Sequence, residues 1–342
     1  MLILVTGATG FVASQLIPRL LDRGHHVRAL ARDPRRLDKE CWSTCVDTMA
    51  GDVLTPSTLP AAVQSVHTAY YLIHSMASGR GYAERDLIAA RNFAQAAAAA
   101  GVQHIIYLGG LANPLQPLAS HLRSRIETGA MLRRGPVPVT EFRCGVIVGA
   151  GSLSFEMIRR ITELLPVVPG PVGLHNKTQP IAAQNVVEYL LAALDHPQYR
   201  RKIFEIGGPD VTSYAGLMLD YARVRGLRRG VMLIPGLPVW LMALGTSMLT
   251  RVPHGVAKAV LGGLANESVV QHADALRAFA EVKLIDYASA AQDALTQMRR
   301  ARNEHRIAGN ARMRGAHRIM AIGRALLPAR MRNPWHTTGL TT

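Results

Sequence analysis

The feature that most constrains the fold is a glycine-rich turn that joins an apolar segment to an amphipathic one near residue 1. Residues 2–6 read Leu-Ile-Leu-Val-Thr, which is typical of a buried strand, and residues 11–21 carry apolar side chains at helical spacing. Gly7 and Gly10 lie between them and allow a tight turn from the strand into the helix. This order predicts the first βα unit of a parallel sheet.

The rest of the chain alternates short apolar strands with helices. This alternation predicts an α/β fold with a doubly wound parallel sheet of the Rossmann type. Further strands are expected at 26–31, 47–51, 68–73, 103–108 and 136–144, and helices at 82–100 and 121–132. We expect residues 1–150 to form this domain. Residues 151–297 should form a smaller substrate-side region packed on it, with a helix at 181–194 and a strand at 202–206, and 298–342 a basic helical tail.

The glycine turn has the spacing of a phosphate-binding loop for a dinucleotide. Gly7 permits the turn, Gly10 lets the backbone approach a pyrophosphate, and Ala13 is small enough for the helix to pack on the strand. The helix that begins near Gly10 directs free amide groups and the positive end of its dipole toward the phosphates. We therefore expect a dinucleotide cofactor to be bound by Gly7, Thr9, Gly10, Phe11 and Val12.

The end of the second strand discriminates between the two nicotinamide cofactors. An NAD site normally has an acid there to bind the ribose hydroxyls, whereas this chain has Arg32, with Arg28 nearby. A guanidinium in this place can pair with a 2′-phosphate, so NADP is favoured over NAD, although Asp33 could still contact a ribose. After the third strand, Asp52 and Val53 suit the adenine side.

Seven segments share the pattern of one known family. They are 6–12 (TGATGFV), 27–34 (VRALARDP), 51–53 (GDV), 69–76 (AYYLIHSM), 107–111 (YLGGL), 138–143 (PVTEFR) and 204–210 (FEIGGPD). With them the chain resembles the NmrA-like branch of the atypical, extended-type short-chain dehydrogenase/reductases, over about residues 1–295. The resemblance implies that His74, Ser75 and Gly109 border the cofactor and that Arg143 lies near the nicotinamide.

The chain departs from the superfamily's catalytic pattern. Catalytic members use a serine and then Tyr-x-x-x-Lys on the next helix; the tyrosine exchanges a proton with the substrate oxygen, and the lysine lowers its pKa and holds the ribose. Here Gly109 or Gly110 stands at the serine position, and the helix offers His121 and Arg125 at the same i, i+4 spacing. Either His121 is the acid/base, with Arg125 on the ribose or a phosphate, or His121 only begins the helix and the chemistry is absent.

Two classes of function follow. The intact loop favours an NADP-dependent oxidoreductase that acts on a small, largely apolar molecule, in a pocket that residues 231–249 would line or cover. The missing Tyr-x-x-x-Lys pair and the basic tail favour a non-catalytic NAD(P)-binding redox sensor, or an assembly or accessory subunit at a membrane. Cofactor oxidation with a candidate substrate would separate the two.

Residues 231–250 contain no charged residue, and their length suits a helix that crosses a bilayer. However, Pro235, Gly236 and Pro238 interrupt the first third, so we favour a buried or lipid-facing wall. The three cysteines, Cys41, Cys45 and Cys144, are too few and too scattered for a disulfide framework or a metal site. Because the first residues do not read as a secretory signal, we expect a cytoplasmic protein.

The net charge of +16 is unevenly distributed. Residues 299–332 hold ten arginines and one acid, Glu304, so that +9 lies in the tail. Residues 318–327 can form a helix with an apolar side flanked by arginines, which is the make-up of an interfacial helix. We expect peripheral attachment to an anionic membrane surface, the alternative being a solvated extension. Nucleic-acid binding is disfavoured, because the tail has only Trp335 for base stacking and no recognition motif.

Overall fold

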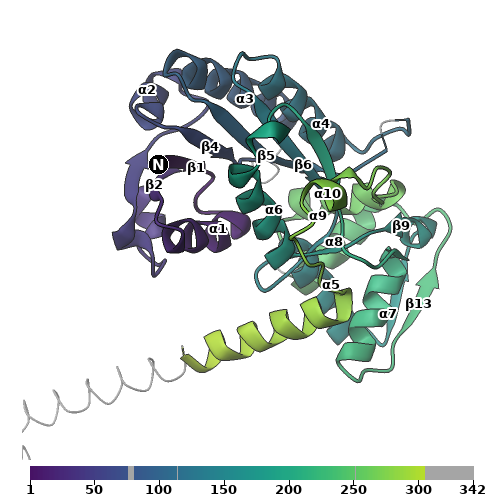
Figure 1. The fold of residues 1–342 in the computed structure, drawn as a ribbon. Helices are drawn as coiled ribbons and strands as arrows, with labels where there is room; N and C mark the ends of the chain where they lie inside the picture. Colours follow the sequence, from purple (N-terminus) through teal and green to yellow (C-terminus); the bar gives the residue numbers. More distant parts are fainter. Residues whose placement is uncertain (76–80, 114, 251, 305–342) are drawn as a thin grey trace, which may run out of the picture. The chain divides into compact units, whose positions relative to one another are not determined.

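The fold is built around a seven-stranded sheet in the order β11-β6-β5-β4-β1-β2-β3 (Figure 1). The structure, a computed structural model, describes residues 1–75, 81–113, 115–250 and 252–304. All neighbouring strands of this sheet are parallel. Strand order reverses between the adjacent strands β1 and β4, which is the switch point where Rossmann folds bind dinucleotides. The strands are β1 (Leu2–Thr6), β2 (His26–Ala31), β3 (Asp47–Ala50), β4 (Thr68–Tyr71), β5 (His104–Gly110), β6 (Val139–Cys144) and β11 (Ile203–Ile206).

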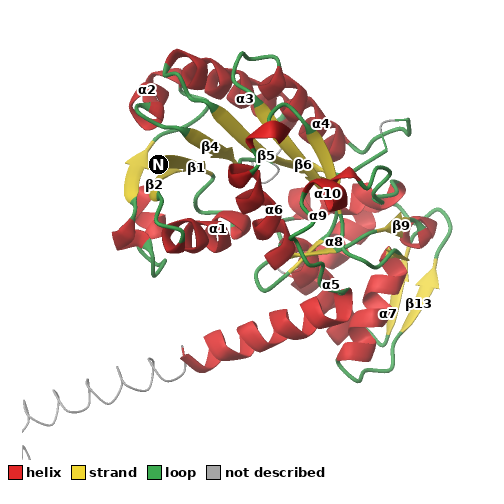
Figure 2. Cartoon of the chain, viewed as in Figure 1, coloured by secondary structure: helices red, strands yellow, loops and turns green. Residues whose placement is uncertain are grey.

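Helices cover both faces of the sheet (Figure 2). Helices α1 (Phe11–Asp22) and α6 (Ala183–Asp195) share one core cluster with the sheet, whereas α2 (Leu59–Val63), α3 (Tyr82–Ala99) and α4 (Ser120–Arg133) share the other. Successive strand residues serve opposite clusters: Tyr70 packs under α1 and α6, and Tyr71 packs under α2 and α3. The structure therefore confirms the doubly wound α/β sheet predicted from the sequence.

The residues after β6 add a smaller region of helices and short strand pairs. Its helices α5, α8 and α9 share a separate apolar core that includes Met157, Ala243 and Leu261. The helices of this region are α5 (Leu153–Leu164), α7 (Tyr214–Val224), α8 (Val239–Thr250) and α9 (His254–Gly262), whereas α10 (Asp274–Ala278) packs with α1 and α6 in a core cluster of the main sheet. The pairs are β7 (Ile147–Val148) with β10 (Ile181–Ala182), β9 (Lys177–Thr178) with β12 (Thr212–Ser213), and β8 (Val167–Gly170) with β13 (Gly230–Leu233).

Two predicted elements differ from the structure. The helix expected at 181–194 begins only at Ala183, because Ile181 and Ala182 pair with β7. The apolar stretch 231–250 is divided by the turn around Gly236 into strand β13 and helix α8, so it is not one continuous helix. Within the described ranges, no helix has both the length and the apolarity that a bilayer crossing requires.

Residues beyond position 150 also contribute to the main sheet. Strand β11 is its edge strand, and helix α6 packs on one of its faces. Residues Met1–Ala294 form one compact unit and Leu295–Thr342 a second one. In the second unit, residues 295–304 are helical. The interfacial helix expected at 318–327 lies outside the described residues.

Candidate functional site

The turn between β1 and α1 requires glycine for two reasons. Gly7 has a φ of +66°, and a Cβ atom there would lie 2.9 Å from the carbonyl oxygen of Leu72, just after β4. The amide of Gly10 donates to the carbonyl oxygen of Gly7 at 2.8 Å, which closes the turn. The predicted glycine positions are therefore set by left-handed backbone and by close approach to the neighbouring strand.

Helix α1 begins at this turn without a side-chain cap, since its N-cap residue is Gly10. The first amide groups of an uncapped helix have no partner within the helix, and together with the helix dipole they form an anion site. Thr9 is exposed beside them, and the ring of Phe11 packs against Gly149, where a Cβ atom would lie 2.9 Å from it. Val12 packs against the core cluster below α1. This arrangement suits a pyrophosphate.

A cleft of about 290 Å³ runs from this turn along the carboxyl ends of the strands. Eight of the predicted site residues line it, namely Gly7, Gly10, Phe11, Val12, His74, Gly109, His121 and Arg125. Thr9, Arg32, Asp52, Val53, Ser75 and Arg143 do not line it.

At the end of β2, the side chain of Arg32 is exposed, and it makes no ion pair in the described part of the chain. Asp33 is occupied, because its carboxylate caps the short helix η1 (Pro34–Leu37) and pairs with Arg35 at 2.9 Å. Asp33 is therefore engaged by η1 and Arg35, whereas Arg32 has no ionic partner within the described residues.

Arg28 does not reach this place. Its guanidinium pairs with Asp47 at 2.7 Å and donates to the carbonyl oxygens of Ala61, Ala62 and Gln64. Asp47 is the first residue of β3, so these contacts lie away from the carboxyl end of β2. Although Arg28 is near Arg32 in the sequence, its guanidinium is engaged by Asp47 and by carbonyl groups in and just after α2 (Leu59–Val63).

Asp52 and Val53 follow β3, as expected for the adenine side. One carboxylate oxygen of Asp52 accepts from the amide of Leu54 at 2.9 Å, whereas the other makes no hydrogen bond within the described residues. Val53 is buried, and its carbonyl oxygen accepts from Asn92 at 3.0 Å. The free oxygen of Asp52 is thus an available acceptor beside a fixed turn.

The loop after β4 is held by a buried carboxylate. Asp86, on α3, accepts from the amide of Ser75 and from the hydroxyl of Ser124, on α4, both at 2.9 Å. These bonds fix the loop that carries His74 at the cleft. Ser75 therefore anchors the loop with its backbone.

Arg143 does not face the cleft. Its guanidinium donates to the fully buried Glu141 at 2.6 Å, and Arg133 of α4 forms an ion pair with the same carboxylate. Residues two apart on a strand share a face, so Arg143 lies on the side of Glu141, while its neighbour Cys144 lines the cleft. The expectation that Arg143 lies at the nicotinamide is corrected accordingly.

Two glycines occupy the expected position of the catalytic serine, and only Gly109 is tightly surrounded. A Cβ atom on Gly109 would lie 3.1 Å from the ring of Tyr107, and one on Gly110 would lie 3.4 Å from Arg125. Neither residue supplies a hydroxyl. Catalytic groups at the cleft must therefore come from other elements.

Helix α4 brings both His121 and Arg125 to the cleft. Arg125 donates to the carbonyl oxygen of Leu108 at 2.8 Å. Burial, and to a smaller extent the charge of Arg125, lowers the pKa of His121 to about 4, so the imidazole is neutral at neutral pH. Its Nδ1 atom is buried and has no partner in the described part of the chain.

Residues 1–212, which contain the glycine turn, β5 and α4, match the NmrA-like family. The chain belongs to this family. It therefore has the NAD(P)-binding Rossmann fold of the atypical short-chain dehydrogenase/reductases.

Comparison with individual proteins agrees with this assignment. Cinnamoyl-CoA reductase 1 of Oryza sativa subsp. japonica is 26% identical over 208 residues, which cover 56% of this chain and 59% of the rice protein. The chain thus spans about three fifths of the length of that relative. Triphenylmethane reductase of Citrobacter sp., solved with NADP(H), has a TM-score of 0.68 at 18% identity, covering 85% of this chain and 99% of that chain. The NADPH-dependent quinone oxidoreductase of Escherichia coli, solved with NADPH, has a TM-score of 0.65 at 18% identity, covering 85% and 98%.

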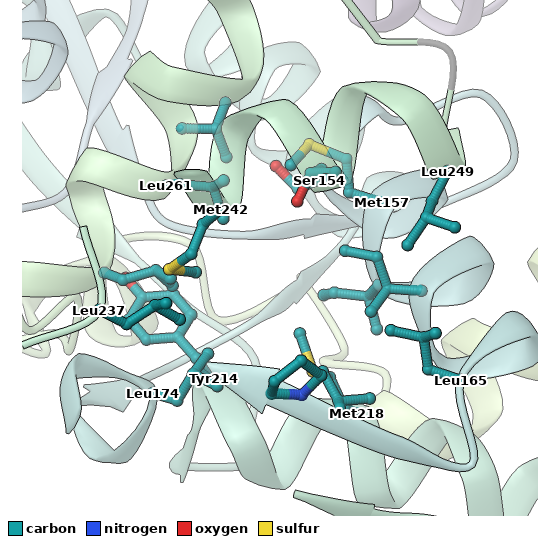
Figure 3. A pocket seen from close by; sticks show the side chains of 18 of the residues that line it. Ser154, Met157, Leu165, Leu174, Tyr214, Met218, Leu237, Met242, Leu249 and Leu261 are labelled. Atoms are coloured by element: carbon teal, nitrogen blue, oxygen red, sulfur yellow. The ribbon is translucent and has the colours of Figure 1, made fainter. Parts of the chain in front are cut away.

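Beside the cleft, this NmrA-like protein contains a second cavity of about 420 Å³. Figure 3 shows that its wall is almost entirely apolar, with Met157, Met218, Leu237, Met242 and Leu249 among the labelled side chains. Val146, Ser154, Tyr214 and Val260 line both the cavity and the cleft. The sequence indicated only one part of this wall, through the apolar stretch 231–249.

Four hydroxyl groups at the cleft were not predicted. That of Ser152 donates to the carbonyl oxygen of Ile147 at 2.6 Å. Ser154 makes no hydrogen bond within the described residues, and the hydroxyl of Tyr214 donates to the carbonyl oxygen of Asn266 at 3.3 Å. Burial raises the pKa of Tyr214 to about 12. Ser268 lines the cleft and donates to the carbonyl oxygen of Leu111 at 3.1 Å. No local motif marks these residues, because they reach the cleft only through tertiary packing.

Proposed function

We propose that this protein is an NADPH-dependent reductase that transfers a hydride to a small apolar molecule. The observation that carries the proposal is that the two cavities adjoin, since Val146, Ser154, Tyr214 and Val260 line both of them. A molecule held in the apolar cavity would border the cleft that suits a nicotinamide. NADPH would give up a hydride, the acceptor would take it, and one proton would complete the reduced product.

Two observations support NADPH as the donor. Arg32 is exposed and unpaired within the described residues at the end of β2, while Asp33 is turned into the cap of η1. In addition, the triphenylmethane reductase and the quinone oxidoreductase with the same fold were solved with NADP(H) and NADPH. A guanidinium binds a phosphate through charge-assisted hydrogen bonds, which NADH cannot form at this position.

His121, in the cleft, and Tyr214, between the cleft and the apolar cavity, suit a neutral hydrogen-bonding role. With a pKa of about 4, His121 carries no proton to give as an imidazolium at neutral pH, and Tyr214, with a pKa of about 12, stays un-ionised. A neutral imidazole can still donate a hydrogen bond to a substrate oxygen and so polarise it toward hydride attack, and Tyr214 can do so if its hydroxyl exchanges the bond to Asn266 for one to the substrate. The proton can then arrive from water through the cleft.

A second candidate function is a cofactor-binding sensor or accessory subunit without turnover. It is favoured by the buried, neutral His121 in place of the tyrosine, and by the glycines at the serine position. In that case the cleft would bind NADPH and the apolar cavity would hold a regulator or remain idle.

The two functions separate in one experiment. NADPH is titrated into the protein, and single-turnover oxidation of the bound cofactor is then followed with a panel of apolar carbonyls, quinones and azo compounds. A reductase oxidises one equivalent of NADPH with at least one class of acceptor. Tight binding without oxidation by any class would favour the sensor, and lack of binding of both nicotinamide cofactors would contradict both.

A further inference from the structure

Helix α8 presents apolar side chains in every direction, since Val239–Thr250 contains no charged residue. Three sides of the helix have different surroundings. Ala243, Thr246 and Thr250 are buried in the protein, and Met242, Gly245 and Leu249 line the apolar cavity. The third side faces outward.

The outward side of α8 is formed by four large apolar residues. Trp240 is 56% exposed, Leu241 44%, Leu244 46% and Met248 77%. At 100° per residue they occupy one arc of about a quarter turn, and Leu241 also lines the cavity. The exposed apolar arc therefore continues directly into the wall of the substrate cavity.

Exposed apolar residues also gather on the opposite side of the cavity. Leu164, Val167 and Met232 are exposed, and they stand next in sequence or in strand register to the cavity-lining residues Leu165, Val168 and Pro169. Soluble proteins rarely leave several large apolar side chains uncovered around one cavity, and their presence indicates an interaction site. We name the seven residues the apolar rim: Leu164, Val167, Met232, Trp240, Leu241, Leu244 and Met248.

The segment that carries five of the seven rim residues has charges of one sign only. Residues 221–266 hold five arginines and Lys258, with no aspartate or glutamate. Arg223 and Arg225 pair with Asp220 and Glu163, respectively. Arg228 and Lys258, in contrast, are exposed and form no ion pair in the part of the chain that the structure describes.

We propose that the apolar rim docks onto an anionic lipid bilayer, with the cavity opening toward the lipid. The apolar side chains would enter the headgroup boundary while cations such as Arg228 and Lys258 stay with the phosphates. Charge favours a lipid over a second copy of the chain, because a symmetric dimer would bring like-charged surfaces together. Resting on the proposed function, the substrate is then a bilayer-resident hydride acceptor, of the quinone or long-chain carbonyl class.

The full-length chain can be tested by co-sedimentation with vesicles of phosphatidylcholine alone and with added phosphatidylglycerol. The rim variant combines W240Q, L244Q and M248Q and leaves the cavity wall intact. The control variant combines L115Q, V211Q and L276Q, which are also exposed apolar residues. Because all variants keep the basic tail, a difference between them reports the rim.

The rim variant should bind anionic vesicles about tenfold or more weakly than the native chain, since partition depends on the apolar surface inserted. The control should bind like the native chain. The W335F substitution leaves Trp42 and Trp240 as the two tryptophans, and Trp42 is buried in the protein. Quenching of tryptophan fluorescence by brominated acyl chains should therefore report the insertion of Trp240. Equal binding by the rim variant and the control, or an absence of quenching, would overturn the docking proposal.

A protein interface is a separate outcome. If sedimentation velocity shows a native dimer that the rim variant converts to a monomer, and neither protein binds lipid, the rim is an interface between copies and the proposal fails.

Cofactor binding is tested independently of lipid binding. The affinity for NADPH should be the same in the native chain, the rim variant and the control variant. If vesicle binding depends on the rim but no NADPH is oxidised, the docking proposal stands and the proposed reductase function fails. If NADPH is oxidised but no vesicles are bound, the reductase function stands and the docking proposal fails. For a quinone supplied in vesicles, kcat/KM should fall in the rim variant, but not for a water-soluble quinone.

Discussion

Arg125 and Leu108 link the helix α4 to the strand β5 through a hydrogen bond of 2.8 Å from the guanidinium to the carbonyl oxygen. The hydroxyl of Tyr107 donates in return to the carbonyl oxygen of Arg125, also at 2.8 Å. These two bonds hold the side of α4 that carries His121 and Arg125 against the cleft. His121 and Arg125 thus keep the i, i+4 spacing of the superfamily's Tyr-x-x-x-Lys pair, with different side chains.

Replacement of Arg32 by aspartate should change cofactor preference. The loss of charge-assisted bonds to a 2′-phosphate, each worth about 1.5–3 kcal/mol, predicts that NADPH affinity falls about 10- to 100-fold while NADH affinity is kept or rises. Calorimetric titration of both cofactors against the native protein and the variant measures this. Arg91→Asp makes the same charge change on the exposed side of α3 and should alter neither affinity. Equal NADPH and NADH affinities in the native protein would refute the role of Arg32.

Replacement of His121 by phenylalanine should abolish turnover and leave NADPH affinity within about twofold. A positioned hydrogen-bonding group contributes on the order of a hundredfold or more to rate. Because the pKa of His121 is about 4, the native pH–rate profile should show no inflection from this residue near neutral pH. Single-turnover rates across pH provide the measurement. Full activity in the variant would mean that Tyr214, Ser154 or water supplies the polarising contact.

A leucine at Gly245 should block the apolar cavity. Gly245 lines that cavity, and a Cβ atom there would meet nothing within 4 Å, so the new side chain projects into open space. We expect kcat/KM for an apolar acceptor to fall about tenfold or more, since lost pocket contacts are worth about 1–3 kcal/mol. NADPH affinity should not change. Gly255→Leu, in α9 and equally open but outside the cavity lining, is the matched control, and similar kinetics in both variants would exclude the cavity as the substrate site.

The buried His104 should make the protein acid-sensitive. Burial, with a smaller contribution from Arg200, lowers its pKa to about 3, and its Nε2 bonds to the hydroxyl of Thr140 at 2.8 Å. The unfolded state, with a pKa near 6.5, binds a proton first, so stability is complete above that value and is lost as pH falls toward 3. The loss should approach about 1.4 kcal/mol per pH unit from this residue. Urea unfolding at neutral and mildly acid pH should show a smaller pH dependence in His104→Gln, and an unchanged dependence would contradict the assignment.

Alanine at Gly129 should destabilise the fold. A Cβ atom there would lie 2.5 Å from a carboxylate oxygen of the fully buried Glu141, which is already held by Arg133 and Arg143. Disturbance of a buried, ion-paired group predicts a loss of about 3 kcal/mol in the free energy of unfolding. Gly255→Ala, also in a helix but with open space around it, should be neutral or slightly stabilising. Equal thermal unfolding midpoints for the two variants would be inconsistent with the packing described.

The sequence alone determined the parallel α/β sheet, the phosphate loop at Gly7 and Gly10, and the position of His121 and Arg125 on one side of a helix. These features depend on spacing over a few residues: strand alternation, the i, i+4 helical repeat, and backbone conformations that favour glycine. The same local reasoning placed Arg32 at the end of β2, because a strand's end lies at the sheet edge whatever surrounds it.

Only the tertiary structure decided where side chains on those elements find partners. Arg28 and Arg143 carry the same charge as Arg32, yet they are bound by Asp47 and Glu141 whereas Arg32 has no ionic partner within the described residues. Asp47 lies opposite Arg28 because strand register places it there, and Glu141 is buried between Arg143 and Arg133 of α4. Likewise, Tyr214 and Val260 reach the cleft from more than 100 residues beyond α1, which no short-range pattern can indicate. The substrate cavity exists because helices and strands distant in sequence pack around one space, and the free energy that holds them comes from long-range apolar contacts.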